Sequence, residues 1–258
     1  MNKTKIEYVD YTWNPVTGCF HGCPYCYARR IANRFKPKYP LGDDCIQPDD
    51  DIYEIRYKSQ SFKYGFYPTF HSYRLNEPVK VQKPSRIFVS SMGDLFGEWV
   101  HPRWIRDVLA VCEECKQHTF LFLTKNPRRY IEFIKFKGEV NRIDFPGNCW
   151  VGTTITNQKD ANERLPLLCK SKASVKFVSY EPMMGRVDIS LWTVSGYEEP
   201  PFDDVIDWVI IGAMTGPGAI KPKPEWIESI IKQCRDAGVP LFIKDNVRWP
   251  VKIQEFPV

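Results

Sequence analysis

Three cysteines, Cys19, Cys23 and Cys26, stand within eight residues in the stretch GCFHGCPYCYA. Their spacing is C-x3-C-x2-C, and the glycines and proline around them favour a loop. Thiolates are ligands of zinc and of iron–sulfur clusters, and three of them would leave one iron of a cubane cluster without a protein ligand. A catalytic metal centre needs such an open position, whereas a structural one lacks it. The loop therefore predicts a metal centre that can bind a further ligand.

A zinc site is the first alternative, with His21 as the fourth ligand. His21 lies only two residues from both Cys19 and Cys23, which makes a tetrahedral arrangement of all four side chains difficult. Buried thiols without any metal are the second alternative. The chain has 9 cysteines, an odd number, and its start, MNKTKIEYVD, lacks the apolar stretch of an export signal. We therefore expect a reducing, cytoplasmic setting rather than a disulfide framework.

The elements that must position this loop follow a regular period. Six runs rich in β-branched and aliphatic residues begin at positions 87, 119, 149, 175, 207 and 240, and their spacing matches one buried strand plus one crossover helix. The runs are almost continuously apolar, as expected of strands covered on both faces. An extended stretch at 8–13 adds a strand in front of the cysteine loop. The pattern predicts an α/β fold, an incomplete parallel (βα) barrel, in which the C-terminal ends of the strands carry the chemistry.

Helical periodicity fills the intervals between these runs. We expect helices over residues 102–116, 127–137, 159–170 and 224–237; proline opens the first two, and Gly238 closes the last. Residues 36–84 break the period and are too long for an ordinary connection, so they predict an insertion folded over one face of the barrel. The whole chain, residues 1–258, is then expected to be a single domain with this insertion.

The composition limits the classes of partner. Hydrophobic residues make up 43% of the chain, which is enough for a globular core. No run approaches the roughly 18 apolar residues that suggest a membrane span, so we expect no membrane partner. The net charge of +5 permits an anionic partner without requiring one.

The cysteine loop resembles the cluster loop of radical SAM enzymes. It reads C-x3-C-x-aromatic-C, with Tyr25 as the aromatic residue, and it follows the first predicted strand of the barrel. More narrowly, the chain resembles the phage-associated three-Cys-motif family, a radical-SAM-like group. It differs from many members of that family in its compact cysteine spacing and in the run GAMT at 212–215, where many carry a glutamate. The matching stretches cover most of the chain: TWNPVTGC, CYARR, FHSYRLNEP, RIFVSSMGDLFGEW, FLFLTKNPRRY, WVGTTITN, FVSYEPMMG, DWVIIGAMTGPGA and AGVPLFIKDN.

This resemblance implies a fold, a cluster and a cofactor. The fold would be a radical SAM partial barrel of (βα)6 type with an extra C-terminal strand and an aromatic-rich insertion. Cys19, Cys23 and Cys26 would hold one [4Fe-4S] cluster, and S-adenosylmethionine would bind its open iron. One electron, from a separate electron donor, would then cleave the cofactor to a 5′-deoxyadenosyl radical, while the protein positions the reactants and excludes solvent.

The resemblance also assigns residues at the strand ends to S-adenosylmethionine. Backbone carbonyls after the second strand, with Asp94, would receive its ammonium group, although Asp94 is also a candidate helix N-cap. Lys125 would pair with its carboxylate. Residues at the end of the fourth strand would bind ribose hydroxyls, those at the end of the fifth would reach ribose or substrate, and small residues at the sixth would leave room for adenine. Ordinary caps and turns are the alternative at each position. The predicted cofactor-binding residues are Tyr25, Ser91, Gly93, Asp94, Lys125, Thr153, Thr154, Asn157, Ser179, Glu181, Gly212 and Ala213.

Two further patterns suggest additional sites. Cys112 and Cys115 would share one helix face, as a second metal centre or, more ordinarily, as buried thiols. Residues 56–74 interleave aromatic and basic side chains, which suits base stacking and phosphate contact and predicts DNA or RNA as a partner. The alternative, slightly favoured, is an aromatic-rich insertion that packs on the barrel with its charges solvated. The predicted nucleic-acid contacts are Arg56, Lys58, Lys63, Tyr64, Tyr67 and Arg74.

The sequence thus favours a cytoplasmic radical SAM enzyme that modifies an anionic substrate, with nucleic acid among the candidates. The first rival is a non-catalytic nucleic-acid-binding protein that contains zinc or a cluster, and metal analysis separates zinc from iron. The second rival is a barrel enzyme of another type with a degenerate cluster loop. Failure to cleave S-adenosylmethionine under reducing conditions would support that rival.

Overall fold

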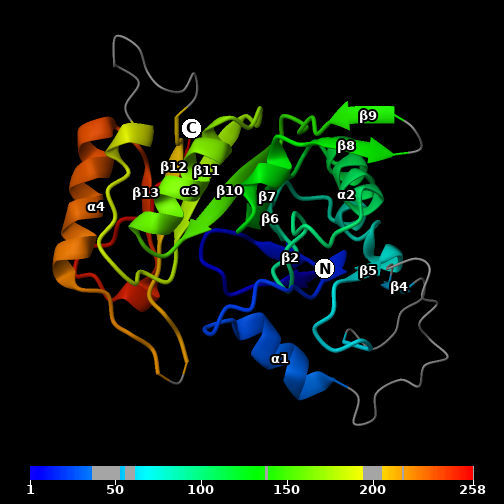
Figure 1. Cartoon of the computed structure of the whole chain (residues 1–258), viewed down its shortest axis with the longest axis horizontal. Helices are drawn as coiled ribbons and strands as arrows, with labels where there is room; N and C mark the ends of the chain where they lie inside the picture. The colour runs from blue at the N-terminus through cyan, green and yellow to red at the C-terminus, as the bar shows by residue number, and fades with distance from the viewer. Residues whose placement is uncertain (37–52, 56–61, 137–138, 194–204, 217, 258) are drawn as a thin grey trace. The chain divides into compact units, whose positions relative to one another are not determined.

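The computed structural model describes residues 1–36, 53–55, 62–136, 139–193, 205–216 and 218–257 (Figure 1). The chain divides into two compact units, which we describe separately. Unit 1 comprises Met1–Phe122 and Ile134–Asn141, and unit 2 comprises Leu123–Phe133 and Arg142–Val258. The expectation of a single domain stays a prediction.

Unit 1 combines a largely parallel sheet with a small mixed one. Its elements are β1 (Asn2–Lys3), β2 (Tyr11–Trp13), β3 (Val16–Thr17), α1 (Tyr27–Phe35), β4 (Tyr53–Ile55), β5 (Thr69–His71), the 3₁₀ turns η2 (Ser72–Arg74) and η3 (Pro78–Lys80), β6 (Arg86–Val89), α2 (Pro102–Glu114) and β7 (Thr119–Thr124), whose last residues belong to unit 2. β1 pairs antiparallel with β2, while β2, β6 and β7 are parallel neighbours. β3, β5 and β4 form the second sheet in that order. The short strands β8 (Phe133–Phe136) and β9 (Glu139–Arg142) pair with each other.

Unit 2 is a parallel sheet with helical crossovers. Its elements are the 3₁₀ turn η4 (Pro127–Tyr130), β10 (Cys149–Ile155), α3 (Gln158–Cys169), β11 (Val175–Tyr180), the turn η5 (Ser190–Trp192), β12 (Trp208–Ile211), α4 (Pro224–Ala237), β13 (Leu241–Ile243) and the turn η6 (Asp245–Val247). The strands lie in the order β10-β11-β12-β13, and all three pairs are parallel. Figure 1 shows α3 and α4 packed beside these strands. Because the strands are parallel, their C-terminal ends meet at one edge of the sheet.

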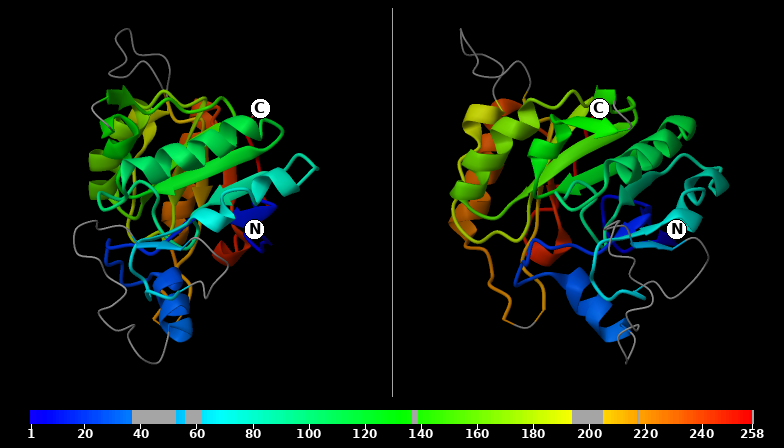
Figure 2. Two further views of the ribbon diagram at one scale, coloured as in Figure 1. Left: turned by 90° about the vertical axis from the view of Figure 1, so that its right-hand side faces the viewer. Right: turned by 45° about the vertical axis from the view of Figure 1, so that its right-hand side comes forward.

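Apolar faces explain why these segments form these elements. Pro102 occupies the first turn of α2, and the inward face of that helix includes Trp104, Ile105 and Val108, all buried. The Trp104 ring stacks on Phe70 with centroids 5.3 Å apart, and Figure 2 shows the helix beside the strands of unit 1. In unit 2 every residue of β12 is buried, as expected of a strand covered on both faces.

Most of the predicted elements are confirmed. The six apolar runs are strands β6, β7, β10, β11, β12 and β13, and the front strand is β2, although it is limited to Tyr11–Trp13. Three helices are confirmed as α2, α3 and α4, and Gly238 follows α4 in the left-handed conformation, with φ 68°.

Within the described residues, no helix has both the length and the apolarity needed to cross a lipid bilayer.

The predicted helix over 127–137 is wrong. Only the turn η4 forms, and β8 follows it. Tyr130 is buried, and its hydroxyl donates to the Gly152 carbonyl at 2.9 Å, a tertiary contact that ends the turn. The next residues, FIKF, are rich in aromatic and β-branched side chains and therefore favour a strand.

Candidate functional site

The cysteine loop of unit 1 begins at the C-terminal end of β6. Gly18 and Gly93 form a parallel β-bridge, and the Gly18 N–H donates to the Met92 carbonyl at 2.9 Å. Gly18 has φ 86°, and a Cβ there would lie 2.1 Å from the Tyr67 carbonyl oxygen; a Cβ at Gly93 would lie 2.8 Å from the Gly18 oxygen. Only glycine at both positions allows this close approach of two backbones.

All three predicted cluster ligands lie in this loop. Cys19, Cys23 and Cys26 are partly exposed, and within the described residues they are free thiols. The Cys26 sulfur accepts the Arg29 N–H at 3.3 Å and so caps α1, while the Cys19 sulfur accepts the His21 N–H at 3.5 Å. Two of the three thiols therefore already have backbone hydrogen-bond donors on sulfur.

Electrostatics disfavour a bare thiolate at Cys19. Burial raises the pKa of the Cys19 thiol to about 12; the His21 N–H lowers it, and Asp94, Cys23 and Cys26 raise it further. Charge on one thiol thus disfavours charge on the next. A bound cation removes this repulsion, so metal uptake at such a loop goes together with the release of protons.

The donor set fits an iron–sulfur cluster better than it fits zinc. The loop offers three thiols and backbone N–H groups aimed at two of them, which matches the ligation of such clusters. The zinc alternative needs His21 as a fourth ligand, and because its Nε2 lies 2.7 Å from Asp94 Oδ2, only Nδ1 is left for a metal. Across the described residues, no group of three or more His, Cys, Asp or Glu side chains is arranged to hold a metal ion.

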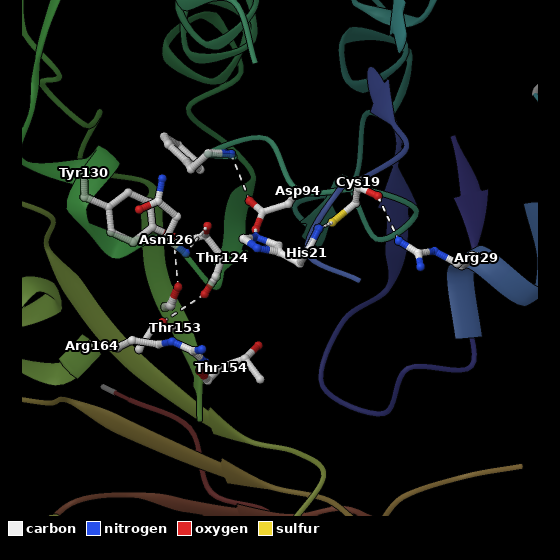
Figure 3. Close-up of polar contacts among 12 residues, drawn as sticks. Cys19, His21, Arg29, Asp94, Thr124, Asn126, Tyr130, Thr153, Thr154 and Arg164 are labelled. Carbon is white, nitrogen blue, oxygen red and sulfur yellow. Dashed lines mark hydrogen bonds and ion pairs between the residues drawn. The ribbon is translucent and has the colours of Figure 1, made fainter. Parts of the chain in front are cut away.

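Asp94 joins the cysteine loop to the segment after β6 (Figure 3). Besides its contact with His21, Asp94 Oδ1 accepts the Phe96 N–H at 3.0 Å. The helix N-cap alternative for Asp94 is wrong, because α2 begins at Pro102 and His101 caps it. Asp94 instead closes the turn that leads toward the helix.

Other predicted residues of unit 1 lie beside this contact. The Ser91 hydroxyl donates to Asn14 Oδ1 at 3.1 Å, and the Ser91 carbonyl accepts the Tyr27 hydroxyl at 2.6 Å. Gly93 forms the bridge to Gly18, and Tyr25 is half-buried in the loop. The structure thus brings together the predicted residues Ser91, Gly93 and Asp94 with the cysteine loop.

Asn14 and Tyr27 are contacts that the sequence analysis missed. Asn14 Oδ1 also accepts the Met92 N–H at 2.9 Å, so one side chain binds both the Ser91 hydroxyl and the next backbone N–H. The signal was present in the sequence, because Asn14 directly follows the front strand, and Tyr27 directly follows Cys26.

In unit 2, the predicted residues in β10 and just after it make hydrogen bonds within the protein. The Thr153 hydroxyl donates to the Thr124 carbonyl at 2.9 Å, and Thr153 is fully buried. The Thr154 carbonyl accepts Arg164 Nη1 at 2.6 Å (Figure 3), and Asn157 caps α3 by accepting the Asp160 N–H at 3.0 Å. Lys125 lies beside Thr124 and is partly exposed.

A second group of predicted residues meets at the ends of β11, β12 and β13. Lys244 Nζ lies 2.5 Å from Glu181 Oε1, and both side chains are mostly buried. A Cβ at Gly212 would lie 2.6 Å from the Glu181 carboxyl carbon, so the glycine makes room for the carboxylate. Ser179 is buried in β11.

Two unpredicted residues complete this group. The Asn246 amide exchanges two hydrogen bonds with the backbone of Ala213, at 3.1 and 3.0 Å, and so extends the sheet where β13 has ended. Lys244 and Asn246 both lie in the stretch FIKDN, where the strand pattern gives way to polar residues. That change was their only sequence signal.

Comparison with known proteins places the chain in a family. The sequence matches the family described as Protein of unknown function (DUF5131) over residues 3–255. The chain belongs to the DUF5131 family. No curated protein sequence matches it.

Solved structures define the fold of this DUF5131 chain. It resembles spore photoproduct lyase, a radical SAM enzyme, in complex with dinucleoside spore photoproduct: the TM-score is 0.52 at 10% identity, over 94% of this chain and 78% of the other. A cysteine-to-serine mutant of the same enzyme gives 0.51 at 9% identity, with the same coverage. The chain therefore has an α/β fold with a mostly parallel sheet that resembles the radical SAM partial barrel.

The aromatic and basic residues of this DUF5131 chain are only partly described. Arg56 and Lys58 lie outside the described residues. The Lys63 ammonium lies 5.4 Å from the Tyr64 ring centroid. Tyr67 is 56% exposed and meets Phe20, itself 51% exposed, with centroids 5.6 Å apart.

Arg74, by contrast, makes structural contacts. Its guanidinium donates to the Asn14 carbonyl at 3.4 Å and to the Tyr73 hydroxyl at 2.9 Å. Its own carbonyl accepts the Trp13 indole N–H at 2.8 Å. The residue therefore helps to hold β2 in place.

Cys112 and Cys115 are buried thiols on or just after α2. No arrangement that could hold a metal ion is found around them within the described part of the chain. Their burial suits the alternative of packed thiols.

Proposed function

We propose that this DUF5131 chain is a radical SAM enzyme that binds one [4Fe-4S] cluster through Cys19, Cys23 and Cys26. One observation carries the proposal: a C-x3-C-x2-C loop is packed on the C-terminal end of β6 in a chain whose fold resembles a radical SAM partial barrel. The narrower likeness to the phage-associated three-Cys-motif family belongs to the same proposal. The proposed setting is the cytoplasm, with a separate electron donor.

The chain's own residues bind and orient the cofactors. Cys19, Cys23 and Cys26 hold the cluster, and the bridge between Gly18 and Gly93 keeps their loop against β6. With S-adenosylmethionine bound, the cluster supplies the electron that releases a 5′-deoxyadenosyl radical. Backbone carbonyls at Ser91 and Gly93 are the proposed acceptors for the ammonium of S-adenosylmethionine, and Tyr25 is proposed to pack beside it.

The remaining residues that the sequence predicts are proposed to contact the rest of the cofactor or the substrate. Lys125 is assigned the methionine carboxylate, and Glu181 the ribose or the substrate. Gly212 and Ala213 leave space for adenine. Thr153, Thr154, Asn157 and Ser179 are kept as proposed ribose-side residues, although the hydrogen bonds described above already occupy the hydroxyl of Thr153 and the amide oxygen of Asn157.

Anaerobic reconstitution tests the proposal. Iron and sulfide in the purified protein, and 5′-deoxyadenosine after addition of dithionite and S-adenosylmethionine, are the expected results. Stoichiometric zinc without iron would instead support a non-catalytic zinc protein. A loaded cluster that never cleaves S-adenosylmethionine would favour another enzyme type with a degenerate cluster loop.

For the substrate, we propose an anionic molecule, and within that class a single-stranded nucleic acid. The support is the pair of exposed rings, Phe20 and Tyr67, beside the cysteine loop. Just beyond the loop, α1 carries Arg30 and Arg34, both exposed, and its first turn has no acidic residue. Aromatic faces beside cationic side chains are typical of surfaces that stack bases and contact phosphates.

A further inference from the structure

Two residues beside the cysteine loop, His21 and Asp94, make a contact that the cluster and cofactor assignments leave unused. His21 Nε2 lies 2.7 Å from Asp94 Oδ2, although the residues are 73 positions apart in sequence. The Asp94 side chain is only 6% exposed and that of His21 20% exposed. A hydrogen bond to a carboxylate is stronger in such a site than at an open surface. The pair is therefore a firm link between the loop and the segment after β6.

Asp94 is held from two sides. Oδ2 faces His21, and Oδ1 accepts the Phe96 N–H. Each oxygen of this buried carboxylate thus accepts a hydrogen bond from a protein group, and turning the side chain would leave buried donors unsatisfied. The orientation of the Asp94 side chain is therefore fixed by protein groups, and its contact with the ammonium of S-adenosylmethionine stays a prediction.

His21 extends the link to the first cluster cysteine. Its backbone N–H donates to the Cys19 sulfur at 3.5 Å, and its ring meets Trp99 edge-on with centroids 4.9 Å apart. The indole in turn packs over Gly97, where a Cβ would lie 2.3 Å from it. With Asp94 on one side and Trp99 on another, residue 21 has little freedom to move its N–H away from the sulfur.

We infer that Asp94 and His21 are positioning residues whose hydrogen bond fixes the Cys19 end of the loop and directs the N–H of residue 21 at the Cys19 sulfur. Asp94 then acts on the metal centre through His21 rather than by touching S-adenosylmethionine. The inference rests on the proposed cluster, because hydrogen bonds to cysteine sulfurs help to set the reduction potential of an iron–sulfur centre. Weakening the pair makes that potential more negative.

The first test needs no metal. Amide hydrogen exchange, followed by mass spectrometry, is measured for the peptide that covers residues 18–27 in the metal-free full chain. His21→Ala and Asp94→Ala should each speed its exchange roughly tenfold, since each removes the same charge-assisted bond. His21→Gln, which keeps a side-chain N–H donor, should restore slow exchange. Glu98→Gln changes an exposed carboxylate of the same segment and should leave the peptide unchanged.

The second test uses the reconstituted protein. A redox titration followed by electron paramagnetic resonance gives the midpoint potential of the cluster, and equilibrium binding gives the affinity for S-adenosylmethionine. His21→Ala and Asp94→Ala should shift the potential in the same negative direction. The double variant should show little more than either single change, because both remove one interaction.

Each result has a defined meaning. Unchanged exchange and unchanged potential in His21→Ala would overturn the inference, as would an Asp94→Asn protein that binds S-adenosylmethionine weakly with a normal potential. Asp94→Asn keeps an oxygen for the Phe96 amide, so it tests the role of residue 94 if Asp94→Ala fails to fold. If the parent protein takes up no cluster, the proposed function fails, while the exchange data still decide whether the pair holds the loop.

Discussion

Gly18 and Gly93 lie so close that a single methyl group on Gly93 would stand 2.8 Å from the Gly18 carbonyl oxygen. The cysteine loop therefore starts directly on the end of β6, with no side chain between the two backbones. The distance between the loop and β6 is set by these two residues.

Gly93→Ala should therefore displace the loop. We expect a loss of about 1–3 kcal/mol in the free energy of unfolding, the usual range for forced overpacking, together with lower iron content after reconstitution. Thermal unfolding and iron analysis measure the two effects. Gly147→Ala is the matched control, because a Cβ there meets nothing within 4 Å. Equal iron in both variants would contradict the role of this close approach.

Cys19→Ala, Cys23→Ala and Cys26→Ala should each lose most of the iron and all cleavage of S-adenosylmethionine, because two thiolates do not retain a cubane with an open site. Iron and sulfide analysis after anaerobic reconstitution measures the first effect, and 5′-deoxyadenosine measures the second. Cys112→Ala removes a buried thiol of α2 and should keep the iron of the parent. A Cys23→Ala protein with full iron and activity would show that the loop is not the metal site.

His71 should make the stability of unit 1 sensitive to mild acid. Burial, with a smaller contribution from Arg74, lowers the pKa of His71 from 6.5 to about 3. The folded protein keeps the ring neutral, so its contribution is complete above pH 6.5 and is lost as the pH falls toward 3. The expected slope is about 1.4 kcal/mol for each pH unit in that window.

Thermal unfolding between pH 6.5 and 5 measures this slope. His71→Gln should flatten it. His101→Asn replaces a half-buried histidine with a good helix N-cap and should leave the slope of stability with pH unchanged. The range stops at pH 5 because Asp188 and Glu255, whose pKa values are lowered by hydrogen bonds to Ser190 and Arg235, lose their own contributions in stronger acid. A His71→Gln protein with the slope of the parent would contradict the assignment.

Ser90 is a non-glycine residue in the left-handed region, with φ 56°, and its buried hydroxyl has no hydrogen-bond partner among the described residues. Ser90→Gly should therefore stabilise the protein by about 1 kcal/mol, since glycine adopts this conformation without strain. Ser171→Gly is the control: its hydroxyl is also buried without a partner, but its φ is not positive. It should lower the melting temperature instead. Equal effects at both positions would show that strain is not the cause.

Single-stranded DNA or RNA should bind more tightly than a neutral polymer, and the affinity should fall steeply with salt. Changing Arg56, Lys58 and Lys63 to Gln should reduce the salt slope by about 0.7 for each phosphate that the protein no longer neutralises. Tyr67→Ala should cost about 1–3 kcal/mol per stacked base without changing that slope. Fluorescence anisotropy over a salt series measures both.

Lys232→Gln, an exposed change on α4, is the control for charge alone and should leave the affinity and the slope unchanged. If no nucleic acid binds above background at moderate salt, the substrate proposal is wrong. The radical chemistry would remain open, because cofactor cleavage does not depend on this surface.

Local signals in the sequence predicted the elements well. Pro102 and Gly238 marked helix ends because their restrictions act within a few residues. Pro127 also acts only locally, so it did not predict a whole helix correctly. It opens a turn, but the buried contact of Tyr130 with Gly152 and the β-prone residues that follow determine the structure of the segment.

The candidate site was predictable only in part. The three cysteines could be recognised from their spacing, since they share one loop. The partners of Asp94 and Glu181 did not, because His21 is 73 residues from Asp94 and Lys244 is 63 residues from Glu181. Such pairs become neighbours only when strands come together, and no local pattern records them.

Cys26 stands at the junction of the metal loop and α1, since its sulfur accepts the Arg29 N–H at the start of that helix. Helix starts favour negative charge, and the first turn of α1 has no acidic side chain to supply it. A thiol is neutral there, whereas a thiolate that holds iron brings the missing charge and still accepts the N–H. Metal occupancy and the order of a nine-residue helix are thereby coupled, so that α1 is expected to fray when iron leaves and to tighten when it returns.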